Sequence, residues 1–186
     1  VVSEMCIRDS PRTIRVVDSL SAALGEGLLV YHACELKEQG KSLTEVADWL
    51  EENKLKCCHW FTVDDLYHLF KGGRVKASGY LLAMALSVKP MMHMDDSGHL
   101  VPVGKVIGRK KSILTLAEQI ATSIVNPEEQ VIFISHGDCV EEAEFLAKKI
   151  KEKVRVKDVV INMLEPVIGA HSGPGTMAVF CLGEHR

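Results

Sequence analysis

The stretch Pro166–Gly175 holds the residue types best suited to chemistry in this sequence. It reads Pro-Val-Ile-Gly-Ala-His-Ser-Gly-Pro-Gly between two expected strands, so we expect a loop with His171 at its tip. Loops of this composition expose consecutive main-chain N–H groups, which can bind an anion. His171, Ser172 and Gly173 would add an imidazole, a hydroxyl and an amide. The pattern indicates a carboxylate or phosphate site, and a tight connection with a solvated histidine is the alternative.

Two further groups of cations could contact an anion. Lys71-Gly-Gly-Arg74 is a glycine-rich turn without the spacing of a P-loop or of a dinucleotide-binding loop. A turn that ends a helix is the simpler interpretation, and Arg74 is a candidate anion contact. Arg109, Lys110 and Lys111 stand at the expected start of a helix, where cations oppose the helix dipole. They indicate a partner surface or a phosphate patch, with an ordinary solvated face as the alternative.

Metal and cofactor chemistry has little support in the sequence. The six cysteines lack CxxC spacing and the eight histidines lack HExxH spacing. Asp64 and Asp65 follow Thr62, and this spacing favours the cap of a short helix over a pair of catalytic carboxylates. We therefore expect no metal, no cofactor and reduced thiols, as in a cytoplasmic protein.

The composition excludes several classes of protein. Of the 186 residues, 47% are hydrophobic and 25% charged, with a net charge of −3, which is unlike a disordered chain. The longest apolar stretch, Gly79–Val88, is half of what a membrane span needs. A sequence pI near 6.3 argues against a nucleic-acid partner. Residues 1–12 show no helical or strand period, and we expect them to be a non-native tail.

The elements that must position these residues follow from hydrophobic periodicity and from turn signals. Helices are expected over Gly25–Gln39, from Ser42, from Thr62 to Phe70, and over Ala77–Leu86, Ser112–Val125 and Val140–Lys151. Strands are expected over Ile14–Val17, Cys57–Val63, Met91–Met94, Leu100–Val106, Val131–Ser135, Val159–Leu164 and Met177–Leu182. Alternation of strands and helices, with a hairpin at Gly98, predicts an α/β fold with mixed sheets flanked by helices.

Several short motifs together resemble one family. They are Phe61-Thr-Val-Asp-Asp-Leu66, Lys71-Gly-Gly-Arg-Val75, Val88-Lys-Pro90, Asp96-Ser-Gly98, Gly108-Arg-Lys-Lys111 and Gly169-Ala-His-Ser-Gly-Pro-Gly175. Their order is similar to that in DegV-family proteins, over nearly all of Ile14–Leu182. The resemblance implies a two-domain architecture, with residues 13–60 as the remnant of a first α/β domain and 61–186 as the second. The family's N-terminal strands and its Ser-Gly-Thr ligand loop are absent, so the first domain is expected to be incomplete.

The resemblance also implies a function. DegV-family proteins bind a long-chain fatty acid, and some act as the binding subunit that presents the carboxylate to the ATP-binding subunit of a fatty acid kinase. A carboxylate site at His171, Ser172, Gly173 and Arg74 is then expected, with Arg109, Lys110 and Lys111 as the partner surface. Ile107 stands where many family members have Arg, which would weaken kinase docking. The expected lining of the acyl pocket is Phe61, Leu81, Leu82, Met84, Ala85 and Met91.

A different class of function stays open from the residues alone. The same loop, with His171, Ser172 and Arg74, could serve a phosphoryl- or acyl-transfer enzyme. Such an enzyme needs a base within hydrogen-bond reach of the serine, and the sequence offers no Ser/His/Asp set at a known spacing. A lipid-binding protein without catalytic residues of its own is the favoured interpretation.

Overall fold

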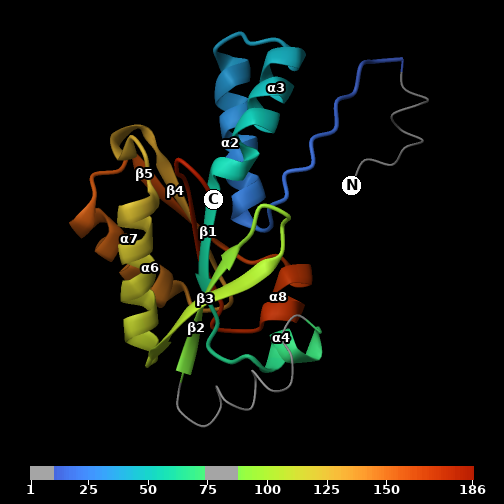
Figure 1. Cartoon of the computed structure of the whole chain (residues 1–186). Helices are drawn as coiled ribbons and strands as arrows, with labels where there is room; N and C mark the ends of the chain where they lie inside the picture. Colours follow the sequence, from blue (N-terminus) through green and yellow to red (C-terminus); the bar gives the residue numbers. More distant parts are fainter. Residues whose placement is uncertain (1–10, 74–87) are drawn as a thin grey trace.

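A six-stranded mixed sheet forms the centre of the protein (Figure 1), in a computed structural model that describes residues 11–73 and 88–186. The strands are β1 (Cys57–Thr62), β2 (Val88–Met94), β3 (Leu100–Ile107), β4 (Val131–His136), β5 (Asp158–Met163) and β6 (Met177–Leu182). The helices are α2 (Leu24–Glu38), α3 (Leu43–Asn53), α4 (Tyr67–Lys71), α6 (Arg109–Ser123), α7 (Val140–Lys153) and α8 (Pro166–Ser172), with 3-10 turns at Lys54–Lys56 and Pro127–Glu129. The α/β fold with a mixed sheet flanked by helices is therefore confirmed.

The strands lie in the order β3-β2-β1-β6-β4-β5. Only β4 and β5 run parallel, and the other neighbours are antiparallel. Strand β6 is central, because it pairs with β1 along its whole length and with β4 on its other side. The described sheet is thus joined through the strand that follows the other five in sequence.

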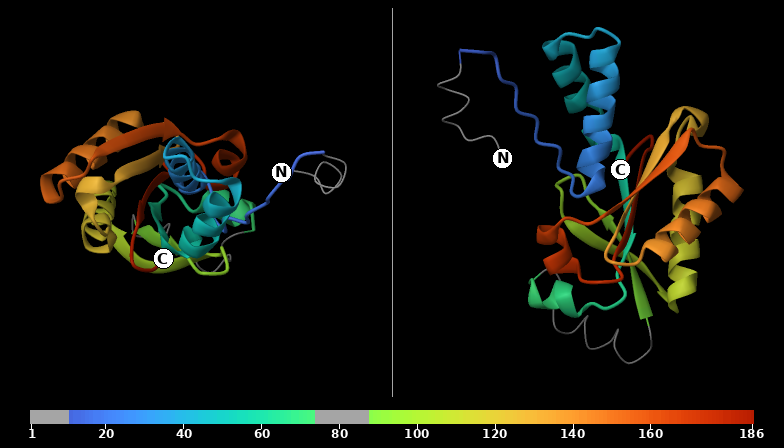
Figure 2. Two further views of the ribbon diagram at one scale, coloured as in Figure 1. Left: turned by 90° about the horizontal axis from the view of Figure 1, so that it is seen from above. Right: turned by 180° about the vertical axis from the view of Figure 1, so that it is seen from behind.

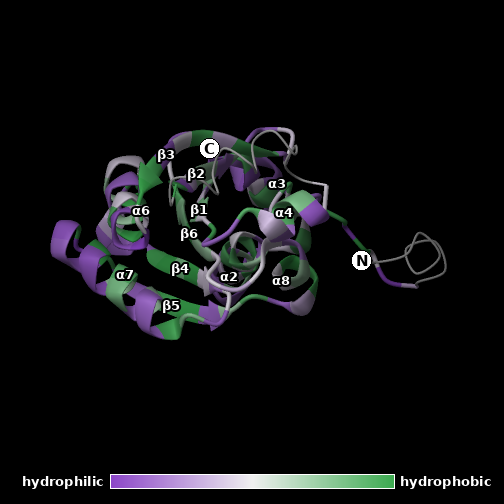
Figure 3. Cartoon of the chain, turned by 90° about the horizontal axis from the view of Figure 1, so that it is seen from below, coloured by the Kyte–Doolittle hydropathy of each residue, from purple (hydrophilic) through white to green (hydrophobic). Residues whose placement is uncertain are grey.

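Helices cover both faces of the sheet (Figure 2). Helices α6 and α7 pack on one face, where α7 turns Ala143, Leu146, Ala147 and Ile150 inward at helical spacing. Figure 3 shows the outer turns of α7 as hydrophilic and the strands beneath as hydrophobic. On the other face α2 packs on β1, β4 and β6, and α3 packs on α2. Helices α4 and α8 contact one another beyond the end of α2 (Figure 1).

Local sequence signals specify several element ends. Ser42 and Glu45 form the capping box of α3, in which each side chain accepts from the other residue's main-chain N–H. Gly98 has φ +79° in the hairpin between β2 and β3, a conformation that glycine adopts without strain. Both features were predicted from the sequence and are confirmed.

Two predicted features are wrong. The Ile14–Val17 run is extended but belongs to no strand, and Val16 is 58% exposed, because no strand of the described residues lies beside it. Thr62 does not cap a helix: it ends β1, its hydroxyl is buried, and α4 begins at Tyr67 after Leu66. Pairing of Thr62 with Met177 of β6 takes precedence over the local capping signal.

Other boundaries move by a few residues. Helix α6 starts at Arg109, three residues before the expected start, and β2 starts at Val88 because Lys89 and Pro90 pair with β3. The helix expected over 77–86 lies outside the described residues. The expected division of the chain between residues 60 and 61 falls inside β1, which pairs with β6 on both sides of it. The assignment of residues 1–12, 13–60 and 61–186 stays a prediction.

The length and hydropathy of the helices show whether any of them could cross a membrane. Within residues 11–73 and 88–186, every helix is too short or too polar to cross a bilayer.

Candidate functional site

A cavity of about 140 Å³ lies between the sheet and helices α4 and α8. Its lining is mostly apolar, with three polar side chains besides one histidine of the sheet. The lining residues are Ala22, Ala23, His59, Phe61, Leu69, Met94, Leu100, Leu164, Ile168, His171, Ser172, Thr176, Ala178 and Phe180. An apolar cavity with a few polar groups at defined places is the usual form of a small-molecule site.

The floor of the cavity follows from the register of β1 and β6. Phe61 pairs with Ala178 and His59 with Phe180, so these four side chains share one face of the sheet. The intervening residues Cys58 and Trp60 face α6 and α7 on the opposite side. The cavity floor is therefore a consequence of strict alternation along two neighbouring strands.

His171 and Ser172 reach the cavity from the end of α8. Pro166 occupies the first turn of this helix, where its missing N–H costs nothing. Gly173, at φ +81°, ends it, and a Cβ there would collide with the ring of His68 on α4. The loop predicted over residues 166–175 is thus a short helix up to Ser172, and His171 lies in its last turn rather than at a loop tip.

The glycine turn after α4 and the histidine of α8 lie side by side. A Cβ added to Gly72 would stand 2.7 Å from Nδ1 of His171, so only glycine allows this approach. The two motifs that the sequence marked as candidate anion contacts are brought together here, although Gly72 and His171 lie 99 positions apart in the sequence. Arg74 itself lies outside the described residues.

The predicted anion nest is not supported. The N–H of Gly173 donates to the carbonyl of Gly169 at 2.8 Å, and that of Gly175 donates to Gly137 at 2.7 Å. Thr176 Oγ1 donates to the carbonyl of Gly173 at 2.7 Å. Because these amides bond within the protein, Gly173 has no N–H to offer a carboxylate, and its role in the site is to end α8.

Ser172 has limited freedom as a donor. Its hydroxyl is buried and donates to the carbonyl of Ile168 at 2.9 Å, a bond within the helix. The oxygen keeps lone pairs that can accept from a ligand. His171 is half-buried beside it and is the side chain of this pair best placed to donate.

Sequence reasoning missed His59. Its side chain is buried, and Nδ1 lies 2.7 Å from the carbonyl oxygen of Cys57. Burial, and then the positive charge of Arg186, lower the pKa of His59 to about 3, so the ring is neutral at pH 7. Its spacing in the sequence could have indicated this, because His59 lies two residues from both Cys57 and Phe61 and so shares their inward-facing side of β1.

The predicted acyl lining is only partly placed at the cavity. Phe61 lines it, whereas Met91 does not: Met91 packs with Cys58 on the face covered by α6. This correction follows from the pleat of β2, which puts Met92 and Met94 on the cavity side and Met91 on the opposite face. The remaining candidates lie outside the described residues: Leu81, Leu82, Met84 and Ala85.

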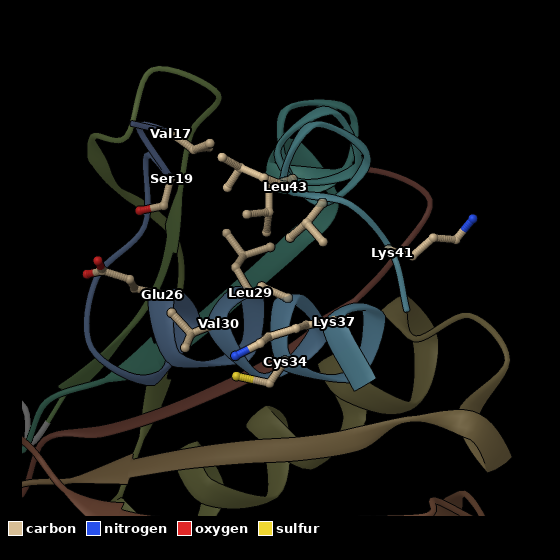
Figure 4. A pocket seen from close by; sticks show the side chains of 12 residues that line it. Val17, Ser19, Glu26, Leu29, Val30, Cys34, Lys37, Lys41 and Leu43 are labelled. Atoms are coloured by element: carbon tan, nitrogen blue, oxygen red, sulfur yellow. The ribbon is translucent and has the colours of Figure 1, made fainter. Parts of the chain in front are cut away.

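A larger hollow of about 530 Å³ lies between α2, α3 and the extended segment before α2 (Figure 4). Leu29, Val30 and Leu43 form part of its apolar wall. Its charged groups do not converge, and Lys41 points away from the hollow. The cavity under α8 is therefore the better candidate for a site that recognises a polar group of a ligand, because His171, Ser172 and Thr176 line it together.

Comparison with known proteins places this geometry in a family. A family model described as "uncharacterised protein, DegV family" matches residues 1–184. The chain belongs to the DegV family. A DegV domain-containing protein of Clostridium perfringens is 51% identical over 173 residues, which are 93% of this chain and 60% of that protein. The chain thus spans about 60% of the length of this curated DegV relative.

Solved DegV structures have the same fold. A DegV lipid-binding protein from Thermotoga maritima matches with a TM-score of 0.82 and 28% identity, over 98% of this chain and 63% of that one. A DegV family protein from Thermus thermophilus, described by its fatty acid binding, matches with a TM-score of 0.81 and 27% identity, over 97% of this chain and 64% of that one.

The basic residues that the sequence marked as a partner surface lie at the start of α6, away from the cavity. They are Arg109, Lys110 and Lys111. Lys110 and Lys111 are exposed, and Ile107 at the end of β3 is 69% exposed. Arg109 is different, because its Nε donates to Glu142 of α7 at 2.9 Å and its side chain is largely buried. Two lysines, rather than three cations, are therefore freely presented to solvent here.

Proposed function

We propose that this protein binds a long-chain fatty acid without catalysing its conversion. The carboxylate lies at the His171–Ser172 end of the cavity, and the acyl chain runs over Phe61. The supporting observation is an apolar cavity with one polar end built from α8. The description of the Thermus thermophilus DegV protein by its fatty acid binding supports the same ligand class.

The head group needs a donor, because a carboxylate removed from water must be hydrogen-bonded or paired. His171 supplies an N–H at the cavity, and Arg74, from the turn after Gly72, is the candidate cation. Ser172 donates to a main-chain carbonyl rather than to a base, which is not the arrangement of an activated nucleophile. This bond favours a carrier over the alternative of a phosphoryl- or acyl-transfer enzyme.

The cavity is smaller than a whole acyl chain requires. Its 140 Å³ compares with about 300–1,000 Å³ for ordinary ligand pockets. We infer that the rest of the pocket comes from residues outside the described ranges, for which Leu81, Leu82, Met84 and Ala85 stay candidates, and from parts of the relatives' length that this chain does not span.

Binding is tested on delipidated protein with a fluorescent fatty acid that unlabelled ligands displace. We expect His171→Ala to weaken fatty acid binding about tenfold or more, as for loss of a hydrogen bond to a charged group. His99→Ala, in the exposed hairpin turn, is the matched control and should leave binding unchanged. A fatty acid methyl ester that binds as tightly as the acid, or wild-type protein that binds neither, would contradict the proposal.

We further propose that the bound carboxylate is presented to an ATP-binding kinase subunit in the cytoplasm, through the surface at the start of α6 that Lys110 and Lys111 form, with Arg109 held behind them by Glu142. Acyl phosphate should form from fatty acid and ATP only when that subunit is added, whereas turnover by the protein alone would support the enzyme alternative. Reversing the charge of Lys110 and Lys111 to Glu should reduce turnover without changing fatty acid binding. The control reverses Lys148 and Lys151 on α7.

A further inference from the structure

Two buried thiols lie directly opposite each other at the centre of the sheet. Cys58 of β1 pairs with Cys181 of β6, and both cysteines are free. Two positions along, the N–H of Gly183 donates to the carbonyl of Lys56 at 2.8 Å, which identifies the cysteines as a hydrogen-bonded pair of the antiparallel ladder. The Cα atoms of such a pair are about 5.5 Å apart, within the range of about 4.4–6.8 Å that a disulfide joins. The backbone therefore already has the spacing that a disulfide needs.

The two side chains are in contact, and their surroundings make the thiols unequal. Opposite residues of antiparallel strands point to the same face of the sheet, which here is the face covered by α6. A hydrogen bond from Cys181 lowers the pKa of the Cys58 thiol, and a hydrogen bond with His93 lowers it further, against the opposing effect of burial. The hydrogen bond to Cys58, together with burial, raises the pKa of Cys181. Cys58 is therefore the thiol that ionises, and Cys181 keeps its proton.

A hollow beside Cys58 offers a route for a small oxidant. The hollow has a volume of about 430 Å³ and lies between the end of α6 and residues 184–186, and Cys58, Trp60 and His93 are part of its lining. The Sγ atom of Cys58 donates to the carbonyl oxygen of His185 at 3.2 Å, and His185 borders the same hollow. Because the residue is only 1% exposed, the site suits hydrogen peroxide, a molecule about the size of water, rather than a bulky disulfide.

We propose that Cys58 and Cys181 are a modification site at which hydrogen peroxide forms a disulfide between β1 and β6. The Cys58 thiolate attacks one peroxide oxygen: an S–O bond forms, the O–O bond breaks, and the hydroxide released takes up the proton that Cys58 gave up on ionising. Cys181 then attacks the sulfur of this sulfenic acid: the S–S bond forms, the S–O bond breaks, and the hydroxide released takes the proton of Cys181. Two electrons thus pass from the two thiols to one peroxide, which becomes two waters. The site lies on the opposite face of β1 and β6 from the cavity under α8, so it is separate from the proposed fatty acid site.

The test treats reduced wild-type protein with hydrogen peroxide, unfolds it with a thiol-blocking reagent and locates the cross-link by mass spectrometry of proteolytic peptides. We expect a link between Cys58 and Cys181 that dithiothreitol reverses, with the loss of two hydrogen atoms from the mass of the protein. Cys57 is the matched control, because it is the next residue of β1, donates to a carbonyl of α2 on the other face, and has a pKa that burial raises to about 12. Cys57→Ser should keep the cross-link, whereas Cys58→Ser should abolish it.

A second readout tests the order of the two steps with dimedone, a reagent that labels sulfenic acids. In Cys181→Ser the Cys58 sulfenic acid should persist and take the label, whereas in wild type the label should be lost as the disulfide closes. The inference is overturned if Cys58 and Cys181 of wild type stay reduced while the exposed Cys34 is oxidised, since the peroxide would then not reach the pair. A link that Cys57 carries, or oxidation of Cys58 to the sulfinic acid without any link, would overturn it as well. Each of these outcomes leaves the proposed fatty acid binding standing.

Discussion

Acid should destabilise this protein through His59, and the size of the effect follows from its environment. In the unfolded chain the ring takes up a proton as the pH falls below its ordinary pKa of 6.5, whereas in the fold it stays neutral down to about 3. Stability from the neutral ring is thus complete above pH 6.5 and is lost as the pH falls towards 3. With 1.36 kcal/mol for each pH unit over which only the unfolded state is protonated, the loss between pH 6 and pH 4.5 is about 2 kcal/mol.

The assay is urea unfolding of delipidated protein at half-unit steps from pH 7 to pH 4.5, with wild type and His59→Phe side by side. Burial also lowers the pKa of His32, and the protein's carboxylates titrate in the same range of pH. Both variants keep these groups, so their contribution to the pH dependence of stability is the same in both curves. The difference between the two curves therefore isolates His59. Replacement of His99, whose side chain is 76% exposed, by Gln is the control and should follow wild type.

The reasoning is refuted if the free energy of unfolding of wild type and of His59→Phe falls in parallel between pH 6 and pH 4.5. Parallel curves would mean that the folded protein binds the proton as readily as the unfolded chain. Water or a counter-charge would then reach the ring of His59. This result would contradict the burial of its Nε2 atom without a hydrogen-bond partner among the described residues.

Three further outcomes are expected in unfolding experiments at neutral pH. Gly173→Ala should lower the free energy of unfolding by at least about 1–2 kcal/mol, because φ is +81° and the new Cβ meets the ring of His68; unchanged stability would contradict the placement of α4 against α8. Ser42→Ala should cost about 1 kcal/mol through loss of the α3 capping box, with Ser42→Gly costing less. Leu28→Ala, at a fully buried position of α2, should cost about 2–5 kcal/mol, whereas exposed Val30→Ala should cost much less.

Local patterns in the sequence predict most of the elements because their cause is local. The β-branched and apolar run at Met177–Leu182 defines β6 with both ends correct, and Ser42 with Glu45 marks the start of α3. The short α8 was missed because Gly169 and the residues after Ser172 are typical of a loop. Pro166, a favoured first residue of a helix, was the signal that could have indicated it.

The candidate site was predicted less completely, because it depends on contacts between distant segments. The sequence marked His171 and the Gly72 turn separately, but nothing local shows that they touch. The face of the sheet on which Met91 lies likewise follows from the pairing of β2 with β1 and β3. His59 was passed over since a polar ring in a strand is ordinary until its burial is known.

The central place of β6 also sets the order in which the protein can fold during synthesis. Among the described residues, Met177–Leu182 alone joins β3, β2 and β1 on one side to β4 and β5 on the other. Until that segment has left the ribosome, β1 and β4 each have an unpaired edge on the side where β6 will lie. Such edges are open to pairing with other chains. Nascent chains of this protein should therefore depend on chaperones until β6 has emerged.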